Sequence, residues 1–202
     1  MLLFVGLGNP GPRYAETPHN AGFVVCDRFA AKHRFGAIGA KFQGEFARGR
    51  ALGADVGLLK PQTFMNLSGE SVAEALRYLP VEPANVVVVF DEMDIPSGKL
   101  RLRKKGGHGG HNGLRSIIEC IGIVRTSRAS GSGSAGRPRA WEATGHLLSK
   151  VPSGERERFS ATVDLAVEAL EVGDQRGLRD RDEPLQRARA DQGRGARHGR
   201  VT

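Results

Sequence analysis

Residues 85–94 read NVVVVFDEMD, in which four valines and a phenylalanine run without a break into a group of carboxylates. A short apolar run bounded by polar residues is typical of a strand that is buried on both faces. The run LLFVGL at residues 2–7 has the same character and stops at the turn-forming residues GNPG at 8–11. Two such strands indicate an α/β protein whose sheet is covered by helices on both sides.

Local patterns along the rest of the chain predict helices and further strands. Thr17 before Pro18 is a helix N-cap signature, and Ser71 with Glu74 forms a capping box at the start of another helix. Helices are predicted from residue 17 to about 33, from 71 to 79, from 114 to 121 and from 153 to about 172, and strands at 41–49, 54–61 and 99–105. This order predicts a single three-layer α/β domain built around a twisted sheet.

The composition limits the classes of protein to which the chain can belong. Its 202 residues, 39% of them hydrophobic, are enough for one domain with a core. No apolar run reaches the length of a membrane span, and the N-terminal residues lack the basic start and cleavage site of a signal peptide, so we expect a soluble protein that is not exported. Two cysteines are too few for a disulfide framework. The net charge of +8 favours a polyanionic partner such as nucleic acid, although basic tails also raise the net charge.

Two stretches do not fit a folded domain. Residues 124–140 consist mainly of serine, glycine, alanine and arginine, and residues 173–202 are rich in arginine and lack aromatic residues. Both compositions predict disorder, because such segments cannot bury enough apolar surface to offset the loss of chain entropy. We therefore expect a domain at residues 1–172, irregular at 124–140, followed by a basic disordered tail at 173–202.

Three polar residues lie at strand ends or helix starts, where α/β proteins build their sites. Asn9 follows the first strand, Asp91 ends the valine strand, and His19 is near the start of the helix that follows Thr17. We expect a neutral His19, because a helix N-terminus disfavours positive charge. A neutral imidazole oriented by a carboxylate can activate water for hydrolysis without a covalent intermediate. The alternative is that His19 is a surface helix residue and Asp91 a strand-end cap.

The glycine-rich segment GGHGGHNGL at residues 106–114 has three interpretations: a metal loop, a phosphate-binding loop or a mobile wall of a substrate site. The spacing of His108 and His111 suggests zinc, but a catalytic zinc takes about three protein ligands and this segment offers two histidines. It also lacks the lysine and the hydroxyl residue of a P-loop. Arg101 and the basic residues 103–105 either hold phosphates beside the segment or form a solvated strand end.

The segment TFMNLSG at residues 63–69 has two interpretations. Phe64 and Met65 precede a helix, where such residues most often belong to the core, and Asn66 can cap that helix. Alternatively, the three residues line a groove in which Asn66 hydrogen-bonds a peptide backbone.

Four motifs, taken together and in this order, resemble those of bacterial-type peptidyl-tRNA hydrolases. They are VGLGNPGPRYAETPHNAG at residues 5–22, KPQTFMNLSG at 60–69, FDEMDIPSGKLRLRKKGGHGGHNGL at 90–114 and WEATGHLLSKV at 141–151. The resemblance is close over residues 2–122 and looser over 137–172. It implies a monomeric, cytoplasmic α/β enzyme with a twisted mixed sheet flanked by helices, without a metal or another cofactor. That family cleaves the ester bond between a peptide and tRNA and so recycles tRNA from stalled translation.

The resemblance also implies a role for individual residues. His19 would be the general base that activates water, Asp91 its orienting partner, and Asn9 would help to distinguish N-blocked from free aminoacyl groups. The others would contact the substrate: Tyr14, Phe64, Asn66 and Asn112 the peptidyl-adenosine end, Met65 and His111 the same cleft, and Arg103, Lys104 and Lys105 a tRNA phosphate. The glycine-rich segment would then be the mobile wall of the substrate cleft.

The sequence departs from the family at residues 124–136, where relatives carry an apolar strand of the form F-x-R-L-R-I-G-I-G. Codons for residues 126–136, read one nucleotide earlier, can restore such a strand, and a similar shift in the tail restores a helix. We therefore hypothesise frameshifts and expect one strand of the sheet to be missing at 124–136. Losing several buried side chains at about 1.5–3 kcal/mol each would threaten a domain that is stable by about 5–15 kcal/mol. The alternatives to an esterase are a non-catalytic RNA-binding relative and an inactive product of a frameshifted gene.

Overall fold

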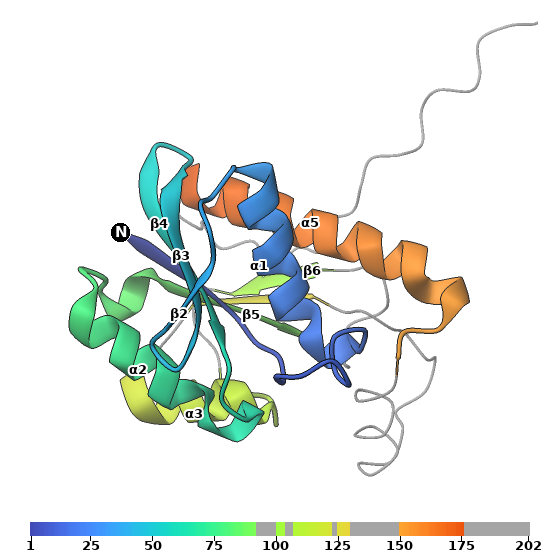
Figure 1. Ribbon diagram of the computed structural model, residues 1–202, viewed down its shortest axis with the longest axis horizontal. Coiled ribbons are helices and arrows are strands. Elements are labelled where there is room, and N and C mark those ends of the chain that lie inside the picture. The colour runs from blue at the N-terminus through green and yellow to red at the C-terminus, as the bar shows by residue number, and fades with distance from the viewer. Residues whose placement is uncertain (92–99, 104–106, 123–124, 130–149, 176–202) are drawn as a thin grey trace, which may run out of the picture.

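The computed structural model describes residues 1–91, 100–103, 107–122, 125–129 and 150–175, which form a sheet with helices on both faces (Figure 1). The strands are β1 (Leu2–Gly6), β2 (Gly39–Lys41), β3 (Gly44–Ala51), β4 (Ala54–Pro61), β5 (Val86–Asp91), β6 (Leu100–Arg103) and β7 (Arg125–Ala129). The α-helices are α1 (Ala21–Lys32), α2 (Ser68–Tyr78), α3 (Asn112–Ile121) and α5 (Arg156–Gln175). Short 3₁₀ helices are η1 (Pro18–Asn20), η2 (Met65–Leu67), η3 (Pro83–Asn85) and η4 (Ser153–Glu155).

Within the described residues the sheet has the strand order β2-β3-β4-β1-β5-β7-β6. The neighbours β4, β1, β5 and β7 run parallel, whereas β2, β3 and β6 each pair antiparallel with a neighbour. The expected mixed sheet is therefore confirmed. The valine strand forms as β5, which lies between β1 and β7. The strands predicted at 41–49 and 54–61 form as β3 and β4, which pair antiparallel with each other.

The central strands bury side chains on both faces, as the unbroken apolar runs predicted. Phe4 of β1 and Val89 of β5 pack with α1 and α5 on one face. Leu3 and Val5 of β1 and Val88 of β5 pack with α2 and α3 on the other. Figure 1 shows the two helix layers on opposite sides of the sheet. Each such side chain contributes about 1.5–3 kcal/mol on burial. Because β1 and β5 supply side chains to both faces, the same two strands stabilise both helix layers.

Helix α1 lies directly on the sheet because glycines remove the side chains at the contact. A Cβ atom at Gly22 of α1 would collide with backbone atoms of Leu7 and Val89, and one at Gly6 would collide with the backbone of Gly22. The backbone of α1 therefore approaches β1 and β5 more closely than any side chain would allow. This contact sets the position of η1, which immediately precedes α1.

The predicted start of the second helix is wrong. Helix α2 begins at Ser68 rather than Ser71, and the Ser71 hydroxyl is buried and donates a hydrogen bond to the Phe42 carbonyl oxygen at 2.6 Å. The capping box with Glu74 therefore does not form, because Ser71 uses its hydroxyl in a tertiary contact. Val72 and Ala75 of α2 are fully buried against the sheet-side core.

The expectation of a missing sheet strand at 124–136 is wrong for Arg125–Ala129, which form β7 between β5 and β6. A strand inside a sheet makes backbone hydrogen bonds to two neighbours, and these bonds do not depend on the apolar content from which we predicted disorder. Residues 130–149 and 176–202 lie outside the described residues. Helix α5 continues to Gln175, past the predicted end near residue 172.

None of the helices in the described part of the chain is both long and apolar enough to cross a membrane.

The close contact of α1 with the sheet makes Gly22 sensitive to a single added methyl group. We expect Gly22→Ala to lower the free energy of unfolding by about 1–3 kcal/mol, because the methyl group must push α1 away from backbone atoms. Urea denaturation measures the change. Gly36→Ala is the matched control, since a Cβ atom there meets nothing within 4 Å. Equal stability of the two variants would contradict the packing argument.

Candidate active site

The candidate site residues gather where parallel strands end. Asp91 is the last residue of β5, Asn9 follows β1, and Met65 begins η2 shortly after β4. Because β4, β1 and β5 are parallel neighbours, their carboxyl ends lie at one edge of the sheet. His19 reaches the same edge from η1, between β1 and α1.

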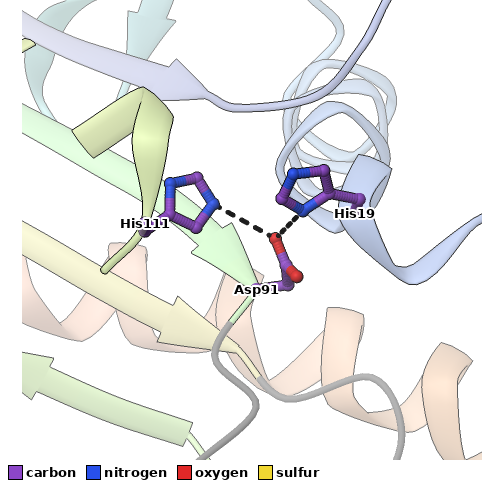
Figure 2. A group of neighbouring side chains, drawn as sticks. All are labelled: His19, Asp91 and His111. Carbon is purple, nitrogen blue, oxygen red and sulfur yellow. Dashed lines mark hydrogen bonds and ion pairs between the residues drawn. The ribbon is translucent and has the colours of Figure 1, made fainter. Parts of the chain in front are cut away.

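His19 and Asp91 form the dyad that the sequence predicted. His19 Nδ1 lies 2.8 Å from Asp91 Oδ1, and the aspartate is only 4% exposed (Figure 2). An ionised carboxylate can only accept, so the imidazole carries its proton on Nδ1 and leaves the Nε2 lone pair available. The prediction that His19 is a plain surface residue is therefore not supported.

Contact between His19 and Asp91 shifts the pKa of both residues, and it shifts that of His19 opposite to the direction predicted from the helix end. Burial lowers the pKa of His19, but the hydrogen bond and the charge of Asp91 outweigh it, so the net shift is upward. Burial raises the pKa of Asp91, but hydrogen bonds from His111 and His19 outweigh burial and hold the pKa well below its usual value. The expectation of a lowered pKa rested on the helix end alone, whereas the hydrogen bond and the charge of Asp91 favour the imidazolium and shift the pKa of His19 upward.

A second imidazole faces the same carboxylate oxygen. His111 Nε2 lies 3.4 Å from Asp91 Oδ1, and His111 Nδ1 accepts a hydrogen bond from the Leu114 backbone N–H at 3.3 Å (Figure 2). His111 is thus the N-cap of α3. Because a donor points at Nδ1, the proton of the neutral ring lies on Nε2 and points toward Asp91.

The zinc interpretation of the glycine-rich segment does not fit these contacts. His108 Nδ1 accepts the Gly110 N–H at 3.1 Å, whereas His111 turns toward Asp91. His19, Asp91 and His111 do offer three donor atoms within 4.8 Å of one another. A metal on His111 Nε2 would require the ring proton on Nδ1, where it would face the Leu114 N–H. These residues are therefore better suited to hydrogen bonding than to holding a metal.

Asn9 is held by a pair of hydrogen bonds that the sequence did not indicate. The backbone N–H of Asn9 donates to Asn20 Oδ1 at 2.8 Å, and Asn20 Nδ2 donates to the Asn9 carbonyl oxygen at 3.0 Å. The Met65 N–H donates to Asn9 Oδ1 at 3.2 Å, which fixes the orientation of the Asn9 amide. Among the described residues, Asn9 Nδ2 then has no partner and is available to a ligand carbonyl. Sequence reasoning missed the buried Asn20, although its place next to His19 was the available signal.

The three residues of the segment after β4 separate in the structure. Phe64 is 70% exposed, so the core interpretation is wrong for it, whereas Met65 is buried, so that interpretation is correct there. Asn66 is exposed within η2 and does not cap α2, whose N-cap is Leu67. Met65 packs against Gly113 at the start of α3, close to His111. Phe64 and Asn66 are therefore free to meet a ligand beside Met65.

The remaining predicted residues lie in different parts of the chain. Tyr14 is half-buried in the loop before η1, where its carbonyl oxygen accepts the Thr17 hydroxyl at 2.8 Å. Asn112 is exposed at the first turn of α3. Arg103 ends β6, and Lys104 and Lys105 lie outside the described residues.

Comparisons with known proteins give one consistent result. A sequence model of the family described as "Peptidyl-tRNA hydrolase" matches residues 3–192. A peptidyl-tRNA hydrolase of a Synechococcus strain is 45% identical over 183 residues, which cover 89% of this chain and 80% of the relative. One from Carboxydothermus hydrogenoformans is 44% identical over 172 residues, covering 85% of this chain and 91% of the relative. The crystal structure of a peptidyl-tRNA hydrolase from Acinetobacter baumannii matches with a TM-score of 0.78 at 36% identity, covering 88% of this chain and 92% of that chain.

The coupling between His19 and Asp91 predicts the effect of neutralising the carboxylate. In Asp91→Asn the burial of His19 persists while the charge is lost, so we expect the pKa of His19 to fall below the ordinary value of about 6.5. A proton NMR titration of the imidazole measures it. Asp55→Asn, which removes an exposed carboxylate paired with Arg48, is the control and should leave the His19 titration as it is. An unchanged titration in Asp91→Asn would contradict the coupling.

Proposed function

The chain belongs to the peptidyl-tRNA hydrolase family, and on that premise we propose that it hydrolyses the ester bond between a peptide and tRNA, with His19 as general base. The observation that carries the assignment of the base is the 2.8 Å contact between His19 Nδ1 and Asp91 Oδ1. It directs the proton of the neutral ring to Nδ1 and leaves Nε2 to act on water.

The proposed reaction needs no covalent intermediate. His19 Nε2 takes a proton from water, and the water oxygen attacks the ester carbonyl carbon. The buried charge of Asp91 stabilises the imidazolium that forms. As the tetrahedral intermediate collapses, the ester C–O bond breaks and Nε2 returns the proton to the ribose oxygen that leaves. The products are the free peptide acid and tRNA.

The substrate contacts follow from side chains near the dyad. The oriented Asn9 amide offers Nδ2 to the carbonyl group that an N-blocked substrate has and a free aminoacyl group lacks. The amide groups of Asn66 and Asn112 are exposed donors for the developing oxyanion. Phe64, with its exposed ring, and Tyr14 offer faces on which the terminal adenosine can stack.

A tRNA phosphate would bind to Arg103, Lys104 and Lys105, which follow one another at the end of β6 and beyond it. The net charge of +8 supports a polyanionic substrate, since basic residues release counterions from nucleic acid when they bind it. We further propose that the chain acts as a monomer in the cytoplasm, where translation produces this substrate. His111 and Met65 complete the proposed cleft.

The two alternative functions have less support. A non-catalytic RNA-binding protein has no need of a buried carboxylate that orients an imidazole, so the geometry favours the enzyme. The inactive product was an alternative because we expected a sheet strand to be missing. Residues 125–129 form strand β7, which pairs with both of its neighbours, so this reason for inactivity does not hold there.

The general base is tested by removing its imidazole. We expect His19→Ala to lower kcat/KM for an N-acetyl-aminoacyl-tRNA by about 10²–10⁴-fold, the usual contribution of a general base. The assay is run with EDTA present, which should leave the activity of the unsubstituted chain unchanged. Because the base must be neutral, kcat/KM should rise as the pH rises through the raised pKa of His19. Full activity of His19→Ala would overturn the proposal.

The role of Asn9 is tested by a substitution of nearly the same shape. Asn9→Asp keeps an oxygen that can accept the Met65 N–H and replaces the Nδ2 donor with an acceptor. We expect kcat/KM to fall by about tenfold or more for an N-acetyl-aminoacyl-tRNA, because the donor to the carbonyl of the blocking group is lost, and to change less for the unblocked aminoacyl-tRNA. An equal loss for both substrates would show that Asn9 does not read the blocking group.

A further inference from the structure

The carboxylate of the dyad has two imidazole partners on a single oxygen. His19 Nδ1 lies 2.8 Å from Asp91 Oδ1, and His111 Nε2 lies 3.4 Å from the same atom (Figure 2). The second contact is longer than the roughly 2.7–3.2 Å that is usual for N–H···O bonds, so it is the weaker of the two. Two donors that approach one oxygen from different elements limit rotation of the carboxylate.

The ring of His111 is itself held in place. The Leu114 N–H donates to its Nδ1, which is the N-cap bond of α3, and the Phe90 ring lies against it with the ring centroids 4.7 Å apart. The cap leaves the ring proton on Nε2, the nitrogen nearest Asp91. In its neutral form His111 is therefore a donor to Asp91 and cannot act as a second base at that position.

We propose that His111 is a positioning residue that holds the Asp91 carboxylate in its orientation toward His19. It does so by donating to the same oxygen, Oδ1, that accepts the hydrogen bond from His19. The inference rests on the proposed function of His19. An oxygen that accepts two hydrogen bonds attracts each proton less strongly than an oxygen that accepts one. The imidazolium of His19 is then held less tightly and returns its proton to the leaving ribose oxygen more readily.

Within the described residues, few titratable groups lie close enough to His111 to affect the pH profile of a variant at that position. The titratable groups that face His111 are Asp91 of β5 and His19 of η1. Its other neighbours, Phe90, Gly113 and Leu114, carry no titratable side chain. A change in the pH profile of a His111 variant therefore reports on the dyad.

Two substitutions separate the contact with Asp91 from the helix cap. His111→Asn retains a side-chain oxygen that can cap α3, because asparagine is among the best N-cap residues, but its shorter side chain does not reach Asp91. His111→Gln has an amide nitrogen at about the distance of Nε2 from the backbone and is a poor cap. His111→Asn thus loses the contact with Asp91 and keeps the cap, whereas His111→Gln keeps the contact and loses the cap.

We expect His111→Asn to melt near the temperature of the unsubstituted chain while kcat/KM falls about tenfold, as loss of a hydrogen bond to a charged group would produce. The acid limb of its pH profile should move to higher pH, because Asp91 then acts on His19 alone. His111→Gln should melt at a lower temperature yet recover most of the lost kcat/KM, with the acid limb returned. Asp91→Asn should move the acid limb in the opposite direction, to lower pH.

His33→Asn is the matched control, since it makes the same exchange at a histidine that also bonds a carboxylate, Glu171, outside the proposed site. It should leave the rate and the pH profile as they are. Activity that follows the melting temperature, with His111→Asn unimpaired and His111→Gln slow, would overturn the proposal and assign His111 to the helix cap alone. That result would not affect the proposed roles of His19 and Asp91, whereas full activity of His19→Ala would overturn the assignment of His19 as general base.

Discussion

A carboxylate buried at the end of a central strand needs hydrogen-bond donors, and this need organises the site around it. Asp91 is 4% exposed, and an unpaired charge at that depth would strongly destabilise the fold. One donor, His19, precedes α1 on one face of the sheet, and the other, His111, is the N-cap of α3 on the opposite face. Asp91 therefore links the two helix layers at the edge where the parallel strands end.

The backbone contacts that hold the donor segments are as important as the donors. Gly6 and Gly22 allow α1 to lie on β1 and β5, and this contact sets where η1 can lie. The side-chain amide of Asn20, the residue after His19, bonds to the backbone N–H and carbonyl oxygen of Asn9 and so ties η1 to the segment after β1. The position of the imidazole thus follows from packing of the backbone and from buried hydrogen bonds. A site held in this way needs little reorganisation when charge develops in a reaction.

Strand β7 shows that a segment can join a sheet although its own sequence is not apolar. The segment Arg125–Ala129 has little apolar character, and it still pairs with β5 on one side and β6 on the other. Backbone N–H and carbonyl groups supply this pairing whatever the side chains are. The valines of β5, the neighbour of β7, are buried on both faces and supply apolar burial to this part of the sheet.

The sequence by itself determined the central strands and the helices α1, α3 and α5, because unbroken apolar runs and helical spacing are local patterns. Strand ends alone left the pairing of His19 with Asp91 open beside a surface role, and the family resemblance favoured the pairing. Only the tertiary structure decided the start of α2, where Ser71 bonds to Phe42, and the pairing of β7. It also decided the direction of the His19 pKa, which a carboxylate 72 residues away controls, and the second donor, His111. These features depend on contacts between distant segments, and such contacts have no local pattern to reveal them.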